Sequence, residues 1–495
     1  METTDGRYVK ILEIEPINFM LRSSEEQYNI LSSFASWLKI SPMKLQFKSI
    51  TRKADSDKHI AMIRKELSIE DNAQCKAMGE DYIRLIKDVG SREALTRRFF
   101  LIYQYEAIGR SESDDYSKIY SMLVSAEQNA RAYFMQCGNN IIQPQNPDQA
   151  VAEILYMFFN RRSCVDEPFT DRVNRVIIDT MAAKGKIIGI DPIPHISVRH
   201  FIAPRGLDLS HYNYIVMDGR YYCFLYIKGN GYPSTVRGGW MSSLINAGEG
   251  IDIDVHLSRE NRSKTIDKVA QRIRLNRTKL KGMQDTSTDY EELTNSIQAG
   301  YYIKNGIANH NDELLWRKQQ MTDMLKSMDM YLSDCRFQQE DALRSVMPFL
   351  QISPKLQKKT QRNVLTSGAA STYMFTSFEM SDDSGVLLGV NRHNNSLCIV
   401  DLFNTKINKN ANLTMCGTSG TGKTFTLQLL ALRMRMRGIQ CYIIAPIKGH
   451  EFKRACSKIG GEFIKIAPGS PHCINVMEIR HTISPEMELI DEVDY

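Results

Sequence analysis

The sequence contains one short run whose residue types and spacing suit phosphate binding. Residues 417–424 follow the pattern G-x-x-x-x-G-K-[ST], which is that of a P-loop. In such a loop successive backbone N–H groups form a concave anion site, and the glycines let the backbone approach the phosphates closely. The pattern therefore predicts a nucleotide-binding site made of Gly417, Thr418, Ser419, Gly420, Thr421, Gly422, Lys423 and Thr424.

Two residues of this run have side chains with expected chemical roles. The Lys423 ammonium would reach the β- and γ-phosphates, and the Thr424 hydroxyl would ligate a metal ion. The expected cofactors are ATP and Mg²⁺, with Thr424 as the metal ligand.

A P-loop works only where a strand leads into it and a helix leaves it, so the neighbouring segments matter. Residues 411–416 indicate a short buried strand before the loop, and residues 425–436 indicate a helix after it. The apolar run 441–445 and the segment 460–466 predict two further core strands.

Upstream, strands and helices alternate, which is typical of an α/β domain. The expected strands are 8–15, 45–50 and 99–105. One expected helix begins at a cap in residues 24–27, and two others span 57–88 and 115–135. In the middle of the chain, Asp218-Gly219 between 212–217 and 221–227 predicts a hairpin. A strand is expected at 251–257, helices from 263 to 348, and strands at 385–390 and 396–401.

We therefore expect a mixed α/β fold followed by the beginning of a RecA-like P-loop NTPase domain. The expected organisation is an α/β domain at 1–164, a hairpin and helical region at 165–348, and an incomplete ATPase domain at 349–495.

The block from about residue 349 to 479 resembles the conjugation-type (TraC-like) ATPases of type IV secretion systems, which belong to the HerA–FtsK superfamily. The resemblance rests on Ser377-Phe378, Gly389-Val390-Asn391, Asp401-Leu402-Phe403, Asn410-Ala411-Asn412 and the extended P-loop ending at Phe425, in that order. The region before residue 349 is compatible with the family and carries no sharp motif.

The sequence departs from the family pattern at two places. The strand at 441–445 ends in Ala445 where the family has aspartate, and Glu451 falls later than the usual glutamate. The resemblance implies that Glu451 orients water or senses the γ-phosphate; a solvated carboxylate at a helix start stays an equal alternative. Lys448 and His450 are weaker candidates.

The acidic strand that activates water in such motors has one poor candidate, residues 487–492. The expectation is a chain that represents the N-terminal part of a longer protein, able to bind nucleotide without the complete hydrolytic apparatus.

The resemblance implies an ATP-binding motor of a conjugative transfer apparatus that energises assembly or the transfer of DNA or protein substrates. It would form a ring with copies of itself, a hexamer in the complete protein, and dock to inner-membrane components from the cytoplasmic side. DNA or a nucleoprotein would be an indirect substrate. Two alternatives stay open: a DNA-translocating HerA/FtsK-like ATPase, and a truncated, non-catalytic docking subunit.

The amino-acid composition does little to distinguish among these functional alternatives. The chain has 495 residues, a net charge of +6 and ten cysteines without a C-x-x-C pair, which argues against a disulfide framework and a zinc site. The start is polar, and no run is long and apolar enough to span a membrane. Residues 258–282 indicate a basic amphipathic helix, for which a solvated face is favoured over binding to a partner, a membrane surface or nucleic acid. Among these binding functions, docking to a partner or membrane is favoured over DNA. A methionine-rich stripe at Met321, Met324, Leu325, Met328 and Leu332 indicates core packing rather than a docking groove.

Overall fold

A computed structural model of the chain describes most of its residues. The described ranges are 1–53, 57–92, 95–106, 115–186, 191–229, 231–233, 235–247, 250–259, 293–294, 296–302, 310–379, 382, 384–391, 396–405, 410–446, 449–472 and 474. The expected basic helix at 258–282 lies almost wholly outside them, as do residues 487–492 and Lys448.

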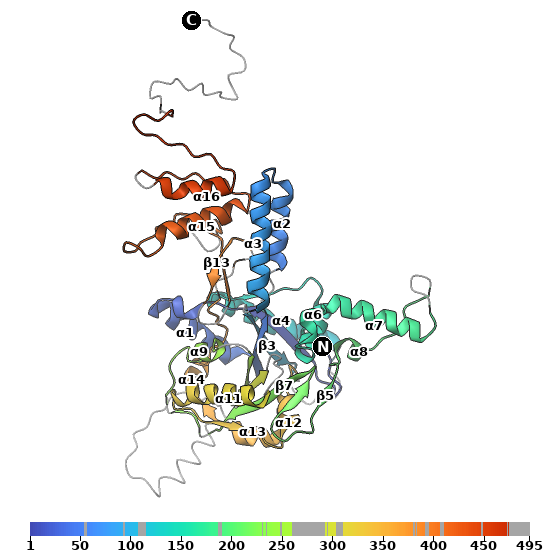
Figure 1. Cartoon of the computed structure of the whole chain (residues 1–495). Coiled ribbons are helices and arrows are strands. Elements are labelled where there is room, and N and C mark those ends of the chain that lie inside the picture. The colour runs from blue at the N-terminus through green and yellow to red at the C-terminus, as the bar shows by residue number, and fades with distance from the viewer. Residues whose placement is uncertain are drawn as a thin grey trace, which may run out of the picture. The chain divides into compact units, whose positions relative to one another are not determined.

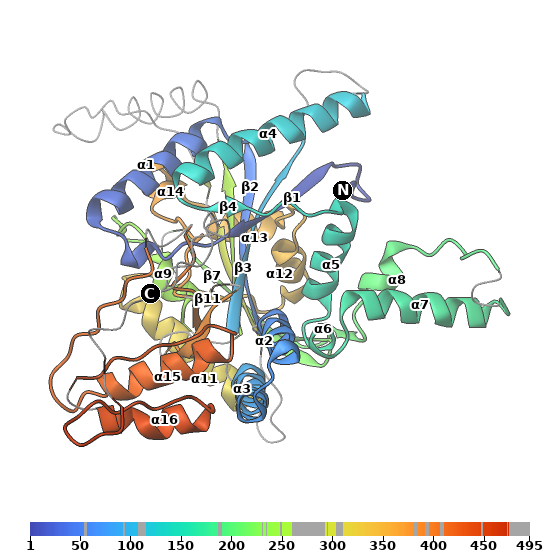
Figure 2. The same ribbon diagram turned by 90° about the horizontal axis from the view of Figure 1, so that it is seen from above.

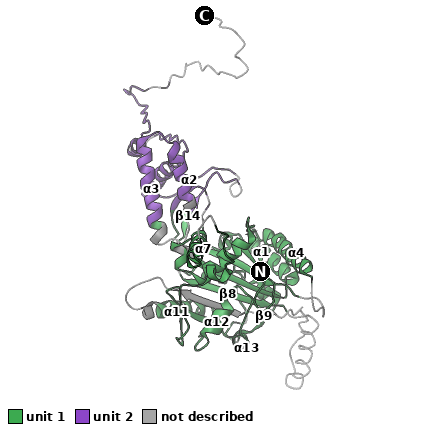
Figure 3. Ribbon diagram, turned by 90° about the vertical axis from the view of Figure 1, so that its right-hand side faces the viewer, with its two compact units in different colours: residues 1–55, 89–381, 389–398 green, residues 56–88, 382–388, 399–495 purple. Residues whose placement is uncertain are grey.

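The chain divides into two compact units, shown in green and purple in Figure 3. The first, here called the sheet unit, comprises residues 1–55, 89–381 and 389–398. The second, here called the P-loop unit, comprises residues 56–88, 382–388 and 399–495. Each unit is therefore assembled from segments far apart in the sequence.

A ten-stranded antiparallel sheet forms the centre of the sheet unit, in the order β4-β1-β3-β2-β8-β10-β7-β6-β5, with β11 also paired to β7. Its strands are β1 (Val9–Glu15), β2 (Lys44–Lys53), β3 (Leu95–Gln104), β4 (Asn140–Ile141), β5 (Leu207–Asp208), β6 (Ile215–Met217), β7 (Arg220–Ile227), β8 (Ile251–Ser258), β10 (Ser296–Tyr302) and β11 (Leu332–Asp334). Both ranges 1–164 and 165–348 supply strands to this one sheet. The expected limits at residues 164 and 348 stay a prediction.

Helices cover both faces of the sheet, as Figures 1 and 2 show for α1, α4 and α14 on one side and α5 and α12 on the other. The helices of this unit are η1 (Phe19–Leu21), α1 (Ser24–Ile40), α4 (Tyr116–Gln136), α5 (Pro147–Phe159), α6 (Ser163–Asp166), α7 (Phe169–Ala183), α8 (Val198–Ile202), α9 (Met241–Ile245), α11 (His310–Lys326), α12 (Gln339–Val346), α13 (Pro354–Thr360) and α14 (Thr366–Ala370). A small sheet of β9 (Leu293–Thr294) and β12 (Asn363–Val364) completes it.

The strand β3 illustrates why both faces need cover. Its residues 99–103 are Phe-Phe-Leu-Ile-Tyr, and each is at most 1% exposed. Alternate side chains enter different cores: Phe99 and Leu101 belong to one apolar cluster, and Phe100 and Ile102 to another that includes α5. A continuous apolar strand is therefore stable here because helices bury it from both sides.

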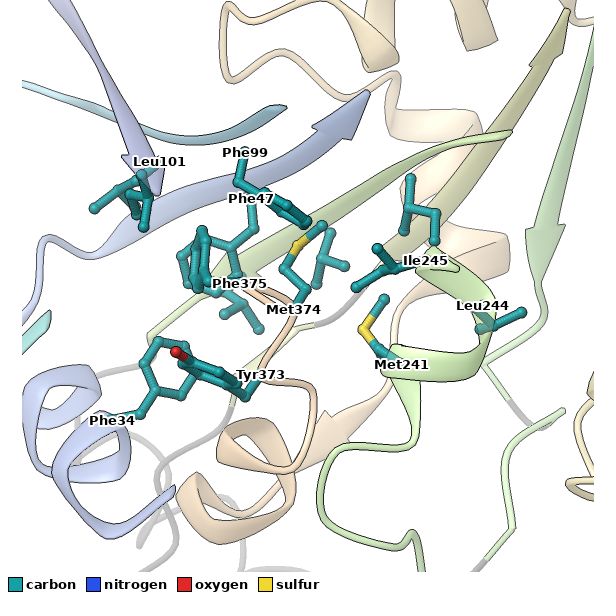
Figure 4. Packing of buried hydrophobic residues seen from close by; sticks show 14 of the residues in the cluster. Phe34, Phe47, Phe99, Leu101, Met241, Leu244, Ile245, Tyr373, Met374 and Phe375 are labelled. Atoms are coloured by element: carbon teal, nitrogen blue, oxygen red, sulfur yellow. The ribbon is translucent and has the colours of Figure 1, made fainter. Parts of the chain in front are cut away.

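An aromatic cluster lies at the centre of the larger core (Figure 4). Phe375 packs on Phe134 and Phe47 with ring centroids 5.0 and 5.3 Å apart, and Phe34 packs on Tyr373 at 5.2 Å. Edge-to-face rings at such distances add to the free energy of burial. The segment after α14 is thus part of the same core as the first strands.

Several predicted elements are confirmed, including the mixed α/β class. The expected hairpin forms between β6 and β7, where Asp218 and Gly219 have φ of 51° and 70°, as a type I′ turn requires. Helix α1 begins with a capping box, although its cap is Ser23 rather than the expected 24–27. The methionine-rich stripe packs in the core, where Met321 and Leu325 are 1% and 3% exposed.

Two predicted helical regions are wrong in part. The expected helix 57–88 is two helices, α2 (Asp57–Ile69) and α3 (Ala73–Arg92). The helix is interrupted because the Asn72 side chain accepts hydrogen bonds from the backbone N–H groups of Gln74 and Cys75 and so caps a new helix. Residues 296–302, expected within a helical region, form β10 because β7 and β8 pair with it on both edges.

The P-loop unit contains α2, α3, α15 (Lys423–Arg435), η2 (Gly449–Phe452) and α16 (Lys453–Lys458). The predicted strands at 385–390 and 396–401 are confirmed as β13 (Val386–Val390) and β14 (Leu397–Val400), which pair with each other. The expected helix at 425–436 is confirmed as α15, which begins two residues earlier and ends one residue earlier.

Candidate functional site

The glycine-rich run forms a turn that leads into the first residue of α15. Gly420 and Gly422 have φ of +81° and +86°, a conformation that residues with a side chain rarely adopt. Gly422 is also the N-cap of α15, so the helix begins at Lys423. These two glycines let the chain turn sharply and bring successive backbone N–H groups to the positive end of the helix dipole.

Lys423 folds back over the loop that precedes it. Its Nζ donates hydrogen bonds to the carbonyl oxygens of Gly417 and Thr418, at 2.8 and 2.6 Å. The Thr421 hydroxyl donates to the Thr418 carbonyl at 2.8 Å, which closes the turn. The Lys423 ammonium therefore lies on the loop next to the N-terminus of α15, so a phosphate bound there would contact both.

The loop is open to solvent. Residues 416–422 are exposed, and Lys423 and Thr424 are half-buried. All eight predicted residues thus lie in one short turn and the first turn of α15, reachable by a ligand.

The three strands expected around the loop are wrong. Residues 411–416, 441–445 and 460–466 form no strand, and the only pairing described there is an isolated bridge between Ile466 and His472. Instead their apolar side chains are exposed, for example Tyr442 at 82% and Ile444 at 93%. A strand is stable only where a neighbour pairs with its backbone groups, and the described residues of this unit bring no such neighbour to these segments.

Glu451 lies in η2, and its main chain is held beside α15, the helix that follows the glycine-rich loop. The Gln428 amide on α15 donates to the Glu451 carbonyl oxygen at 3.0 Å. Gln428 follows Thr424 by four residues, so the contact falls one helical turn beyond the predicted metal ligand. His450 lies in the same short helix.

A second cluster of polar groups, not predicted from the sequence, lies buried in the sheet unit. The Lys48 Nζ is 2.7 Å from the Asp254 Oδ2 and donates to the Val346 carbonyl at 2.8 Å. Gln46 donates to the other Asp254 oxygen at 2.9 Å, and the His256 Nε2 lies 2.9 Å from the Ser345 carbonyl. Burial raises the pKa of Asp254 to about 6 and lowers the pKa of His256 to about 4.

This cluster serves the fold. The carbonyls that it engages belong to the end of α12, so polar side chains on β2 and β8 satisfy a helix C-terminus that is otherwise buried. The signal was the spacing of Gln46 and Lys48 on one strand and Asp254 and His256 on another, each two residues apart and so on one face.

A third buried group is Glu379, whose carboxylate accepts hydrogen bonds from the Arg97 backbone N–H at 2.8 Å and the Thr96 hydroxyl at 3.0 Å. Burial raises the pKa of Glu379 to about 7, although the Arg97 charge opposes that rise. Its hydrogen bonds attach the segment after Phe375 to the start of β3.

The described residues offer few other sites. Nine cysteines are described and all are free. Among the described residues, no group of His, Cys, Asp and Glu side chains could hold a metal ion. None of the helices in the described part of the chain combines the length and apolar character needed to cross a membrane.

The mixed α/β fold and the loop at the start of α15 define a protein with a candidate phosphate-binding site. Comparison with protein families adds that residues 1–110 match the family model described as the archaeal TraC-like domain. The match supports the TraC-like resemblance and falls on β1 to β3 with the α2–α3 helices, a region in which the sequence showed no sharp motif. No curated protein sequence matches the chain.

Proposed function

We propose that this chain is an ATP-binding subunit of a conjugative transfer or type IV secretion apparatus, which uses the loop 417–424 to hold the phosphates of ATP with Mg²⁺. The observation that carries the proposal is the position of Lys423, whose ammonium lies on the loop carbonyls at the N-terminus of α15. The TraC-like match of residues 1–110 supports the conjugative context.

In this proposal each group has a separate task. The backbone N–H groups of the loop bind phosphate oxygens, and Lys423 leaves the carbonyls to pair with the β- and γ-phosphates. Thr424 would ligate Mg²⁺, and Glu451, whose main chain contacts Gln428 one helical turn beyond Thr424, would assist by orienting water. The protein would act as a ring of copies at the cytoplasmic face of a membrane, bound there through membrane partners.

Equilibrium binding of a fluorescent ATP analogue to the full chain, with and without Mg²⁺, tests the nucleotide site. Lys423→Ala should weaken binding at least about tenfold, because a hydrogen bond to a charged group contributes ~1.5–3 kcal/mol. Lys458→Ala, the same substitution at an exposed lysine of α16, should leave the affinity unchanged. Equal affinities of the wild type and Lys423→Ala would refute the nucleotide site.

Turnover separates the motor from its alternatives. Phosphate release that depends on Lys423 and Glu451 supports an ATPase, whereas binding without release supports a non-catalytic docking subunit. Stimulation of release by DNA would favour the DNA-translocating alternative over a role in assembly.

A further inference from the structure

The C-terminal end of α15 is held by the α2–α3 hairpin, although about 330 residues of sequence separate them. Two arginines in the last turn of α15 contact the hairpin: Arg433 lies over Tyr82, and Arg435 pairs with Glu70. Just past the helix end, Arg437 donates to the Gly385 carbonyl. All the groups involved belong to the P-loop unit, and Figure 1 shows α2 and α3 beside α15.

Tyr82 of α3 is the centre of one contact. The Arg433 guanidinium lies over its ring at 5.4 Å, and its hydroxyl accepts a hydrogen bond from the Leu387 N–H at 2.9 Å. The same arginine donates to the Leu387 carbonyl. Tyr82 is 6% exposed, so the stacked cation is largely desolvated, a setting in which such contacts are strongest.

Glu70, at the end of α2, makes the second contact. Its carboxylate lies 2.6 Å from the Arg435 guanidinium, and both side chains are mostly buried, at 11% and 27% exposure. The carboxylate also accepts a hydrogen bond from the Asn72 N–H at 3.0 Å, in the turn between the two helices. That bond, together with Arg435, lowers the pKa of Glu70.

The helices approach closely where α15 ends. Gly438 has φ of +74°, and a Cβ placed there would lie 2.8 Å from the Glu66 carboxylate oxygen. The turn after α15 therefore lies close to the Glu66 side chain of α2, and its positive φ favours glycine at this position.

We infer that the α2–α3 hairpin is the positioning element of the phosphate-binding loop: Glu70 and Tyr82 fix one end of α15, and the loop occupies the other. This inference rests on the proposed nucleotide function. Because α15 is a single continuous helix of 13 residues, a phosphate bound at its N-terminus and the hairpin bound at its C-terminus act on one rigid body. Nucleotide and hairpin order are then coupled, and the coupling is reciprocal.

The α2–α3 hairpin lies within the segment that matches the TraC-like family model, residues 1–110. It connects β2 to β3, which are neighbouring strands of the central sheet. Positioning by Glu70 and Tyr82 thus links the loop at residues 417–424 to the TraC-like segment.

Hydrogen–deuterium exchange of the full chain, with and without the non-hydrolysable ATP analogue AMP-PNP and Mg²⁺, tests the inference. The nucleotide should slow exchange in residues 57–92, by up to about 100-fold at 100 times the Kd. In Arg435→Gln this slowing should fall at least about fivefold and the Kd should rise by a similar factor. The charge swap Glu70→Arg with Arg435→Glu should restore part of both, because it rebuilds the ion pair but not the bond from the Asn72 N–H.

Arg454→Gln is the matched control, since Arg454 is an exposed arginine of α16, and it should behave as the wild type. Tyr82→Phe removes only the hydroxyl that accepts from Leu387 and keeps the test usable if a charge variant does not fold. It should reduce the slowing in 57–92 without changing the helix content.

The two ideas fail in different ways. A wild type without measurable AMP-PNP affinity overturns the nucleotide function. A wild type that binds AMP-PNP while exchange in 57–92 stays the same overturns the positioning role and leaves the nucleotide site intact.

Discussion

Lys48 on β2 and Asp254 on β8 form an ion pair inside the sheet unit, with Nζ and Oδ2 2.7 Å apart and exposures of 3% and 0%. Two charges leave water here at a cost of several kcal/mol, which their attraction and the hydrogen bonds from Gln46 and to Val346 must offset. Removing one partner leaves the other buried and unpaired.

We therefore predict that Lys48→Met at pH 7.5 lowers the free energy of unfolding by about 3–5 kcal/mol. The double variant Lys48→Met with Asp254→Leu should cost less than the single one, because no unpaired charge remains. Urea denaturation measures both. The exposed pair Arg344–Glu340 is the control, and Arg344→Met should cost under about 1 kcal/mol. Similar losses at the two pairs would contradict the importance of burial.

Glu379 predicts a dependence of stability on pH. Burial raises the pKa of this carboxyl from 4.5 to about 7, so the folded state binds its proton more tightly than the unfolded state does. The proton therefore stabilises the fold fully below pH 4.5, and this contribution, on the order of 3 kcal/mol, is lost as pH rises to about 7.

The wild type should thus lose stability relative to Glu379→Gln as pH increases through this window, because glutamine does not titrate. The difference in unfolding free energy between the two proteins, measured at several pH values, checks the sign. A difference that is flat or that grows in the opposite direction would show that Glu379 is charged throughout.

Replacing Gly422 should lower the free energy of unfolding through backbone strain alone. Its φ is +86° and a Cβ would meet no atom within 4 Å, so Gly422→Ala strains the backbone without a clash. We expect a loss of about 1–2 kcal/mol, with weaker ATP binding because the loop opens at the start of α15. Gly206→Ala, also in open space but without positive φ, should change neither quantity. Titration with ATP and thermal unfolding together test this, and an unaltered affinity would count against the loop geometry.

We predict that the turn between α2 and α3 is stabilised by the Asn72 side chain, which caps α3. Asn72→Ala removes the acceptor for the N–H groups of Gln74 and Cys75 and should cost about 1 kcal/mol. The amides of residues 74 and 75 should exchange faster, as NMR can measure. Asn72→Asp keeps the acceptor and should stay close to the wild type; a loss as large as that of Asn72→Ala would mean that the cap is unimportant.

Local signals predicted much of this fold. The Asp218-Gly219 hairpin, the strands at the N-terminus and the helix after the glycine-rich run depend on turn chemistry and short-range periodicity, and all formed where expected. The break at Asn72 was missed because charge and apolar spacing continue across it. A capping asparagine inside a helical pattern was the available signal.

Other elements were determined by pairing and packing with segments distant in the sequence. Residues 296–302 carry no clear alternation, and they became β10 because two neighbours pair with them. The apolar run 441–445 shows the reverse case, since strong β propensity gave no strand without a partner. The alternate spacing of Gln46 and Lys48, and of Asp254 and His256, placed these residues on one face but did not predict their burial, because such a pattern normally indicates a solvated face and here α12 covers it.

The TraC-like match ends at residue 110, but the matched residues pack against parts of the chain beyond it. Within that segment β2 relies on β8 for its second edge, and Phe47 relies on Phe375 in the core. Cut out alone, residues 1–110 would present an unpaired strand edge and an uncovered aromatic face, both of which favour aggregation. The stretch that the family model matches therefore depends on later parts of the chain for its folding.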